Sequence, residues 1–130
     1  MAYNTESESI VIAIRGTLSL EDVIVDMMAE GKRLQPDEVP PNVGPTQLAD
    51  FYVHMGMLLT ARNLRDVILR NRLVEKARAA IAANYPLVVC GHSLGAGVAS
   101  VLAFLLRKYY PEVKAYAYSP PLGLMRCVPF

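Results

Sequence analysis

The chain has 130 residues, and its 13 lysines and arginines against 12 aspartates and glutamates give a formal net charge of +1. A balance this close to neutral provides no electrostatic basis for binding nucleic acid. The hydrophobic fraction of 53% is high for a soluble domain and fits part of a larger hydrophobic core rather than a complete small domain.

Cysteine use and the apolar runs indicate the cellular setting. Two cysteines, Cys90 and Cys127, do not make a disulfide framework and favour a reducing environment facing the cell interior. Residues 1–9 are polar and acidic, and Arg15 interrupts the apolar run that follows, so the sequence predicts no signal peptide. The longest apolar run, 94–106, is too short and too rich in glycine to span a bilayer.

The first predicted element is a strand at Ser9–Ile14, whose β-branched and nearly all apolar residues are typical of a central strand covered on both faces. It ends at Arg15-Gly16-Thr17. Ser19, with Asp22 three residues later, then predicts the start of a short helix. Proline, glycine, aspartate and asparagine dominate residues 35–47, which predicts a loop. This loop is either a lid over a functional site or a solvated excursion, and the pattern favours neither.

Residues 50–54 predict a short strand or an extended entry into a long helix. That helix begins near Gly56 and runs to about Ala83, with a break near Asn71. Its outer face is basic, either as a contact for anionic lipid headgroups or, the favoured interpretation, as a solvated surface. The residues of this face are Arg62, Arg65, Arg70, Arg72, Lys76 and Arg78, offset by Asp66 and Glu75.

Residues 87–106 hold the most informative pattern in the chain. Leu87–Cys90 predicts a short buried strand and Leu94–Leu106 a buried helix. Between them, Gly91-His92-Ser93-Leu94-Gly95 is a G-x-S-x-G pentapeptide, which places a serine on a sharp turn where its hydroxyl can attack a carbonyl. The flanking glycines are needed because a Cβ at either position would collide with the neighbouring strand or helix. The alternative is a glycine-rich connection whose Ser93 merely caps the helix.

The acid and base of a serine triad are not evident. After Ser93 the chain holds a single carboxylate, Glu112, and no histidine. Glu112 lies between the helix and a predicted strand at 113–118, so we expect it at the opposite end of the sheet. His92 is adjacent to Ser93 in a strand-like segment and is expected to point to the opposite face. The sequence therefore predicts a nucleophile without its base.

Strands that alternate with helices predict an α/β fold with a mostly parallel sheet and crossover helices. Within that frame Ile14-Arg15-Gly16-Thr17, His54-x-Gly56 and the elbow at 91–95 together resemble the class 3 lipases. The stretches 91–97, Phe104-Leu105-Leu106-Arg107 and 116–124 are similar to the diacylglycerol lipases in particular. The resemblance implies an α/β-hydrolase-like fold and makes residues 1–130 a partial class 3 lipase domain, incomplete at its C-terminal end.

The resemblance also implies a function. It is hydrolysis of one acyl ester of diacylglycerol to monoacylglycerol and a fatty acid, in lipid catabolism and lipid signalling. Ser93 matches the nucleophile, and Thr17 and Leu94 match the oxyanion-hole donors. The backbone N–H after the nucleophile lies at a helix N-terminus, where the helix dipole favours negative charge. His54 matches a family position that is not the catalytic base, so we expect a structural role. The nucleophile elbow is completed by Gly91, His92 and Gly95.

The family's catalytic aspartate and histidine lie beyond the Ser-Pro-Pro segment at 119–121, and its membrane-spanning helices precede the lipase domain. The full-length protein is therefore expected at a membrane, on the cytoplasmic side, with an acylglycerol and the membrane surface as its partners. Calcium is a cofactor that the resemblance suggests, but no metal ligands are predicted. The pairs Asp22/Asp26 and Asp37/Glu38 fit helix surface and loop polarity better.

Two hypotheses of different class follow. The first is a serine lipase of which this chain is the central portion. The second is a catalytically inactive truncated module that associates with lipid or with protein through its sheet edge.

Overall fold

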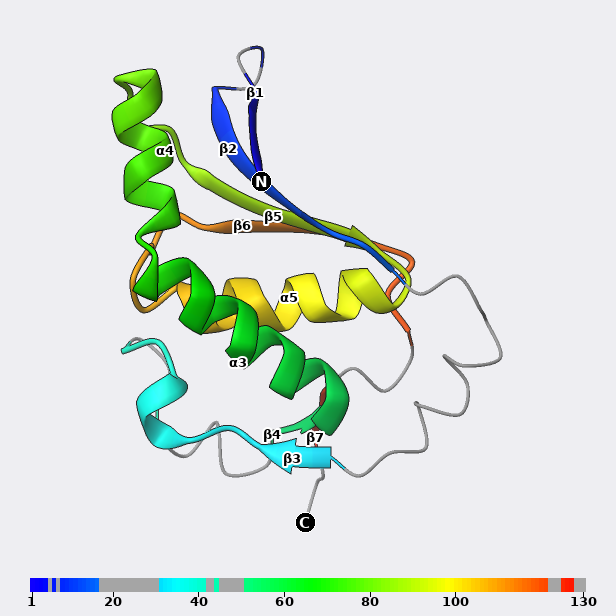
Figure 1. Ribbon diagram of the computed structural model, residues 1–130. Coiled ribbons are helices and arrows are strands. Elements are labelled where there is room, and N and C mark those ends of the chain that lie inside the picture. The colour runs from blue at the N-terminus through cyan, green and yellow to red at the C-terminus, as the bar shows by residue number, and fades with distance from the viewer. Residues whose placement is uncertain are drawn as a thin grey trace.

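The main sheet is mostly parallel, as the sequence predicts. The computed structural model describes residues 1–4, 6, 8–16, 31–41, 44, 51–121 and 125–127. Within these, β2 (Ser9–Ile14), β5 (Leu87–His92) and β6 (Lys114–Tyr118) run parallel in the order β1-β2-β5-β6 (Figure 1). The strand at the other edge, β1 (Ala2–Asn4), pairs antiparallel with β2. The polar N-terminus does not predict β1, because a three-residue edge strand needs only backbone partners and no apolar pattern.

Two of the described helices form layers on one face of the main sheet. The helix α5 (Leu94–Leu106) packs against one face of β2, β5 and β6. The helix α3 (Met55–Arg70) crosses α5 on the side away from this sheet (Figure 1). The predicted buried helix at 94–106 is thus confirmed. The core between these layers contains Ile10, Leu87 and Val89 from the strands and Leu58, Leu102, Leu105 and Leu106 from the helices, all at most 1% exposed.

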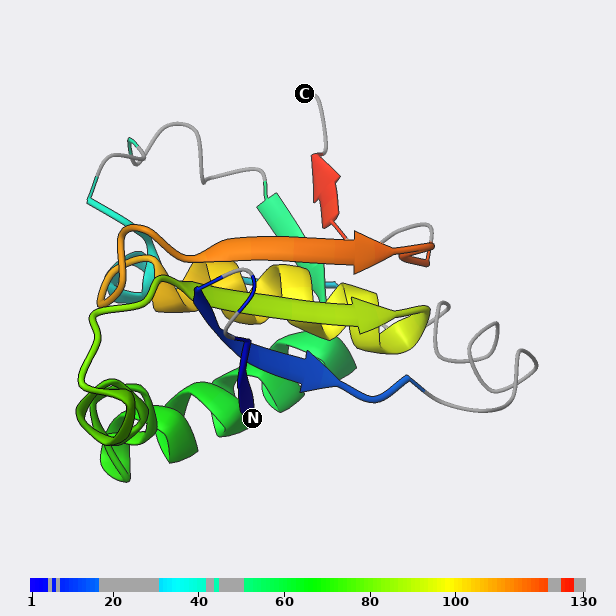
Figure 2. The same ribbon diagram turned by 90° about the horizontal axis from the view of Figure 1, so that it is seen from above.

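The opposite face of the sheet carries no described helix (Figure 2). There Ala13 of β2 is exposed and Val11 is half-buried, and Tyr116 and Tyr118 of β6 are 49% and 61% exposed. In the described part of the chain β2 is therefore covered on one face only. The predicted cover of the second face is not tested by the described residues alone, since residues 17–30 lie outside them, and it stays a prediction.

The long predicted helix is broken where the sequence predicts. The helix α3 ends at Arg70, and α4 (Leu73–Ile81) begins after Arg72, whose φ of 51° is left-handed. The strand β4 (Phe51–His54) leads directly into α3, and His54 is the N-cap residue, its Nδ1 accepting a hydrogen bond from the backbone N–H of Met57 at 3.4 Å. His54 is 6% exposed, which agrees with the structural role expected of it.

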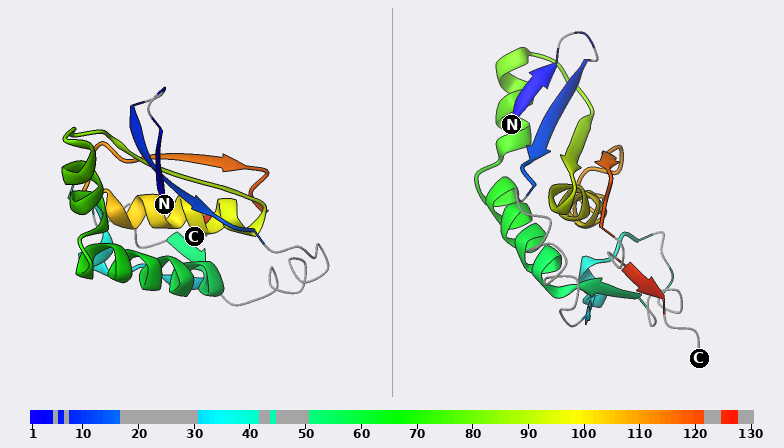
Figure 3. Two further views of the ribbon diagram at one scale, coloured as in Figure 1. Left: turned by 45° about the horizontal axis from the view of Figure 1, so that its top comes forward. Right: turned by 90° about the vertical axis from the view of Figure 1, so that its right-hand side faces the viewer.

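A second, antiparallel sheet has the order β3-β4-β7 and lies on the far side of α5 from the main sheet (Figure 3). The sequence predicts neither β3 (Gly31–Arg33) nor β7 (Met125–Cys127), since three residues are too few to establish an alternating pattern. Both form by backbone pairing with β4, and Arg33 adds two hydrogen bonds to the hydroxyl of Tyr52 at 2.9 and 2.7 Å. The helix predicted after Ser19 lies outside the described residues.

The described part of the 35–47 loop is anchored far from Ser93. Its 3₁₀ helix η1 (Pro36–Glu38) places the Glu38 carboxylate 2.6 Å from Arg62 and 3.3 Å from Arg65 on α3. Lys108, just beyond the C-terminal end of α5, donates to the carbonyl of Asp37 at 2.8 Å. Residues 35–41 therefore do not cover Ser93, which stands at the other end of α5. For them the lid interpretation is wrong, because long-range ion pairs decide where the loop lies.

These ion pairs also correct the predicted basic face. Arg62 and Arg65 are half-buried against Glu38, and Arg78 pairs with Glu112 and donates to the carbonyl of Tyr85 at 3.1 Å. Arg70, Arg72 and Lys76 remain exposed. Three of the six residues of the basic face therefore form ion pairs with carboxylates from outside the two helices.

Candidate active site

Ser93 occupies a strained turn between β5 and α5. Its backbone has φ 54° and ψ −127°, a conformation that costs an L-residue roughly 1–3 kcal/mol and that concentrates at functional sites. The turn is held by three backbone hydrogen bonds. The Ser93 N–H donates to the carbonyl of Tyr118 at 3.0 Å, and the Ser93 carbonyl accepts from Ala96 and Gly97 at 2.9 and 3.2 Å. The strained conformation of Ser93 is therefore held by hydrogen bonds to β6 on one side and to α5 on the other.

The side chain of Ser93 does not cap the helix. Although Ser93 is the N-cap residue of α5, it makes no side-chain capping hydrogen bond. The interpretation of Ser93 as a simple helix cap is therefore wrong, and its hydroxyl stands half-buried at the carboxyl end of the parallel strands. In open α/β sheets this is the end at which ligands bind.

The two elbow glycines are required by close approach, as predicted. A Cβ on the buried Gly95 would lie 2.5 Å from the carbonyl oxygen of Ile14 and 2.9 Å from the backbone nitrogen of Gly16. A Cβ on Gly91 would meet the carbonyl of Gly95 and lie 2.9 Å from the nitrogen of Ala96. Each obstacle is backbone, so the contacts cannot be relieved by a side-chain rotation.

The same contacts bring the end of β2 against the start of α5. Gly16 follows β2 and packs against the carbonyl of His92 and the backbone of Gly95. Leu94 is the first residue of α5, where a backbone N–H has no acceptor within the helix and the helix dipole is positive. Thr17, the other predicted oxyanion donor, lies outside the described residues, but it follows Gly16 directly in the chain.

Neither histidine is placed to act as the base. His92 is exposed at the end of β5, opposite Tyr118 in the strand pairing, and His54 is the N-cap of α3. From the sequence, the side chains of His92 and Ser93 are expected to point to opposite faces of one strand. Instead the strand ends at His92 and the chain turns at Ser93, so strand alternation does not apply to this pair. Glu112 pairs with Arg78 just before β6 begins, at the end of the sheet opposite Ser93, as predicted.

The described ranges contain neither a metal-binding cluster nor a helix able to span a membrane. There, no three histidine, cysteine, aspartate or glutamate side chains gather where they could hold a metal ion. Glu38 is engaged by two arginines, so the Asp37/Glu38 pair fits the loop-polarity interpretation. None of the described helices has the length and hydropathy needed to cross a bilayer.

Comparison with known proteins identifies relatives over nearly the whole chain. A family model described as lipase (class 3) matches residues 11–124. Diacylglycerol lipase-beta of Mus musculus is 42% identical over 118 residues, which cover 91% of this chain and 16% of that protein. Diacylglycerol lipase-alpha of Rattus norvegicus is 36% identical over 129 residues, 96% of this chain and 12% of that protein. The chain thus spans less than a fifth of either of these relatives.

The fold comparison agrees. The crystal structure of a mono- and diacylglycerol lipase from Aspergillus oryzae superposes with a TM-score of 0.64 at 26% identity, covering 89% of this chain and 38% of that one. The solved structures that match are lipases with the α/β-hydrolase fold, so the expected fold class is confirmed.

Proposed function

Because the chain belongs to the class 3 lipase family, we propose that it is the nucleophile-bearing part of a serine lipase. The reaction is hydrolysis of one acyl ester of diacylglycerol to monoacylglycerol and a fatty acid. The observation that carries the proposal is the geometry of Ser93, a strained residue between a parallel strand and a helix whose hydroxyl is not used as a cap. The names of the relatives, diacylglycerol lipases and secreted mono- and diacylglycerol lipases, support the substrate class.

In this mechanism the Oγ of Ser93 attacks the ester carbonyl, and the carbonyl oxygen becomes an oxyanion. The N–H of Leu94, at the positive end of α5, and the backbone N–H of Thr17 donate hydrogen bonds to it. Each such donor contributes roughly 3–4 kcal/mol of transition-state stabilisation. Monoacylglycerol leaves as the alcohol, and water then hydrolyses the acyl-serine to release the fatty acid.

The proton of Ser93 needs a base. His54 is committed to capping α3 and His92 is directed to solvent, so in our proposal a histidine oriented by an acidic residue enters from another polypeptide segment. Without such a base, only the slow catalysis of the oxyanion hole remains.

The substrate suggests where the enzyme works. Diacylglycerol carries two acyl chains and remains in a lipid phase, because burying each methylene contributes about 0.8 kcal/mol. We therefore place the reaction at a membrane surface. The cysteine usage of the chain fits the cytoplasmic side, where diacylglycerol hydrolysis would serve lipid breakdown and lipid signalling.

The test exploits the missing base. Fatty acid release from a short-chain diacylglycerol is measured for the purified 130-residue chain at increasing imidazole concentration, since imidazole can take the proton of Ser93. After the rate of the same imidazole solution without protein is subtracted, we expect the remaining rate to rise with imidazole, to vanish in Ser93→Ala and to persist in Ser100→Ala. Ser100 is a matched control because its hydroxyl bonds the carbonyl of Ala96 on the same helix. Equal rates for the wild type and Ser93→Ala at every imidazole concentration would refute the lipase proposal for this chain and support the inactive, lipid-associating module.

A further inference from the structure

Ser119, the residue that follows β6, has an unusual backbone conformation. Its φ of 49° lies in the left-handed region, which few residues other than glycine adopt. Ser119 opens the Ser-Pro-Pro segment at 119–121, which is part of the stretch that resembles the diacylglycerol lipases. The proposed mechanism gives this segment no role, so its conformation remains to be explained.

Ordinary turns explain most of the other left-handed residues. Among the described residues other than glycine, those that share a positive φ with Ser119 are Glu8, Arg72, Ala82 and Ser93. Glu8 lies in the connection between the antiparallel strands β1 and β2. Arg72 and Ala82 lie at the C-terminal ends of α3 and α4, where left-handed residues are common. Ser119 instead follows a parallel strand and precedes a proline, and a residue before proline favours an extended conformation. Its local preference therefore opposes the conformation that it adopts.

The conformation of Ser119 bears directly on the nucleophile. The backbone N–H of Ser93 donates to the carbonyl of Tyr118 at 3.0 Å, and this carbonyl belongs to the peptide group between Tyr118 and Ser119. Because a peptide group is planar, it turns as a unit about the N–Cα bond of Ser119, and the φ of Ser119 measures that rotation. In the same way, the φ of Ser93 orients the peptide group that carries the donor N–H. The two left-handed torsions therefore orient the donor and the acceptor of one hydrogen bond.

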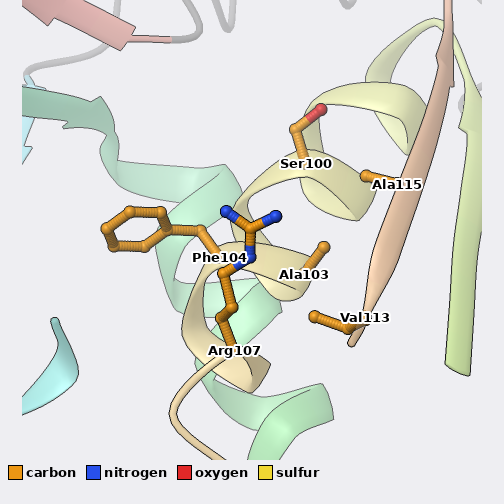
Figure 4. Close-up of a pocket in the computed structure, with 6 residues that line it drawn as sticks. All are labelled: Ser100, Ala103, Phe104, Arg107, Val113 and Ala115. Atoms are coloured by element: carbon orange, nitrogen blue, oxygen red, sulfur yellow. The ribbon is translucent and has the colours of Figure 1, made fainter. Parts of the chain in front are cut away.

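The rest of β6 is fixed by its neighbours. It pairs in register with β5 from Lys114 to Tyr118, and it also packs along α5. Figure 4 shows Val113 and Ala115 on the side of this segment that faces Ala103 of α5. The strand thus brings Tyr118 to the elbow, but the direction of the Tyr118 carbonyl still depends on the rotation at Ser119.

A simpler interpretation is that Ser119 only ends the strand. Pro120 has no backbone N–H and cannot donate to a further rung of the sheet, so the pairing would end there with Ser119 in any conformation. Ending β6 therefore does not require a positive φ at Ser119.

We propose that Ser119 is a positioning residue for the nucleophile of the proposed lipase reaction. Its left-handed backbone turns the Tyr118 carbonyl toward the N–H of Ser93, and the resulting hydrogen bond holds the strained elbow from the β6 side. In this role Ser119 acts through the backbone and need not touch the substrate. The effect on rate rests on the proposed function, whereas the hydrogen bond can be observed independently of it.

Three substitutions separate this role from a general loss of stability. Ser119→Val tests the backbone, because a β-branched residue is strongly disfavoured at a positive φ. Ser119→Gly is the rescue variant, since glycine adopts the same conformation without strain. Arg72→Val is the matched control. Arg72 is also exposed and has a φ of 51°, but it lies at the junction of α3 and α4, near the end of the sheet where β5 and β6 begin (Figure 1). Valine should destabilise the fold there without reaching the elbow.

Two measurements are made on the purified 130-residue chain. The first is the imidazole-dependent hydrolysis of a short-chain diacylglycerol. We expect Ser119→Val to lower the maximal rate at least tenfold while the substrate concentration for half-maximal rate changes less than twofold. Ser119→Gly and Arg72→Val should stay within twofold of the wild type. The second is the exchange of the Ser93 amide hydrogen with solvent, followed by NMR. It should be at least tenfold faster in Ser119→Val than in Arg72→Val, and close to the wild type in Ser119→Gly.

Amide exchange at Ser93 that is no faster in Ser119→Val than in Arg72→Val would overturn the proposal. An unchanged rate of Ser119→Val in an active chain would do so too, as would equal losses in Ser119→Val and Ser119→Gly. If the wild type shows no hydrolysis that depends on Ser93, the proposed function fails, and faster exchange in Ser119→Val alone still sustains the positioning of Ser93. Circular dichroism checks that each variant folds. If Ser119→Val does not fold, Ser119→Ala replaces it, with an expected loss of at least threefold in rate.

Discussion

Replacing Glu38 by glutamine should destabilise the protein far more than a typical surface change. Glu38 is 7% exposed, and four N–H groups donate to its carboxylate. The backbone of Gln35 donates at 2.8 Å, the Nε and Nη2 of Arg62 at 2.6 Å each, and Arg65 at 3.3 Å. This carboxylate alone connects η1 to α3 by ion pairs within the described residues.

The expected magnitude follows from the exposure of the partners. Breaking a fully buried ion pair costs about 3–5 kcal/mol. Here the side chains of Arg62 and Arg65 are 17% and 18% exposed, Arg65 keeps its contact with Asp66, and glutamine retains one acceptor oxygen. We therefore expect a loss of about 2 kcal/mol in the free energy of unfolding. With an unfolding entropy of about 2.1 cal/mol/K per residue, this lowers the melting temperature by about 7 °C.

The dependence on pH checks the cause. Burial alone would raise the pKa of Glu38, but the hydrogen bonds from Arg62 and Gln35 and the charges of Arg62 and Arg65 outweigh it and hold this pKa below the ordinary value of 4.5. A lowered pKa stabilises the folded state fully above the unfolded value and progressively less as the pH falls through the folded pKa. The difference between wild type and Glu38→Gln should therefore be constant at neutral pH and shrink below about pH 4.5.

Urea and thermal denaturation measure the difference. Asp66→Asn is the control, since the Asp66 side chain is 48% exposed and, among the described residues, forms an ion pair with Arg65 alone, at 2.8 Å. A change below about 0.5 kcal/mol is expected for it. If Glu38→Gln costs no more than Asp66→Asn, or if its cost persists unchanged at low pH, the reasoning about the buried carboxylate is wrong.

Three further substitutions test the elbow and the core. Gly95→Ala should lose more than about 2 kcal/mol of stability or fail to fold, because its Cβ would lie 2.5 Å from the Ile14 carbonyl. Gly56→Ala is the control, because a Cβ added there would lie 3.4 Å from the His54 ring, an ordinary contact. Alanine should stabilise the helix by up to about 1 kcal/mol relative to glycine. Equal melting temperatures for Gly95→Ala and Gly56→Ala would contradict the contact argument. Ser93→Gly should raise the free energy of unfolding by about 1 kcal/mol, because glycine adopts φ 54° without strain. The gain would appear as a higher urea midpoint, and a lower midpoint would argue against strain at Ser93. Leu102→Ala, at a fully buried position, should cost about 3 kcal/mol, and a loss below 1 kcal/mol in thermal melting would show that α5 is not packed as described.

Local pattern was sufficient for the elements that form the site. The run of β-branched residues at Ser9–Ile14 and the strand–glycine–helix pattern at 87–106 predict β2, β5 and α5 because each pattern meets its own geometric requirement within a few residues. The requirement for glycine at positions 91 and 95 could be stated in advance for the same reason: an elbow that sharp leaves no room for a Cβ.

Long-range pairing could not be anticipated in this way. The strands β1, β3 and β7 are three residues long, too short for a recognisable pattern, and each forms by backbone pairing with another strand. From the sequence alone, the basic helix face is expected to be solvated. In the structure Glu38, which lies 24 residues before Arg62, pairs with it. Glu112, which lies 34 residues after Arg78, pairs with that arginine. The sequence does not indicate which charges meet across such separations, so the lid and basic-face interpretations had to wait for the fold.

By itself, then, the sequence determined the nucleophile turn, the strand–helix order and the family, since these depend on residue types at fixed short spacings. Only the tertiary structure decided that Ser93 does not cap α5, that His54 does cap α3, and that residues 35–41 lie at the far end of α5 from Ser93. The physical reason is the same in each case. Hydrogen bonds and ion pairs are satisfied by whichever partner the fold brings within about 3 Å, and that distance is a property of packing rather than of sequence order.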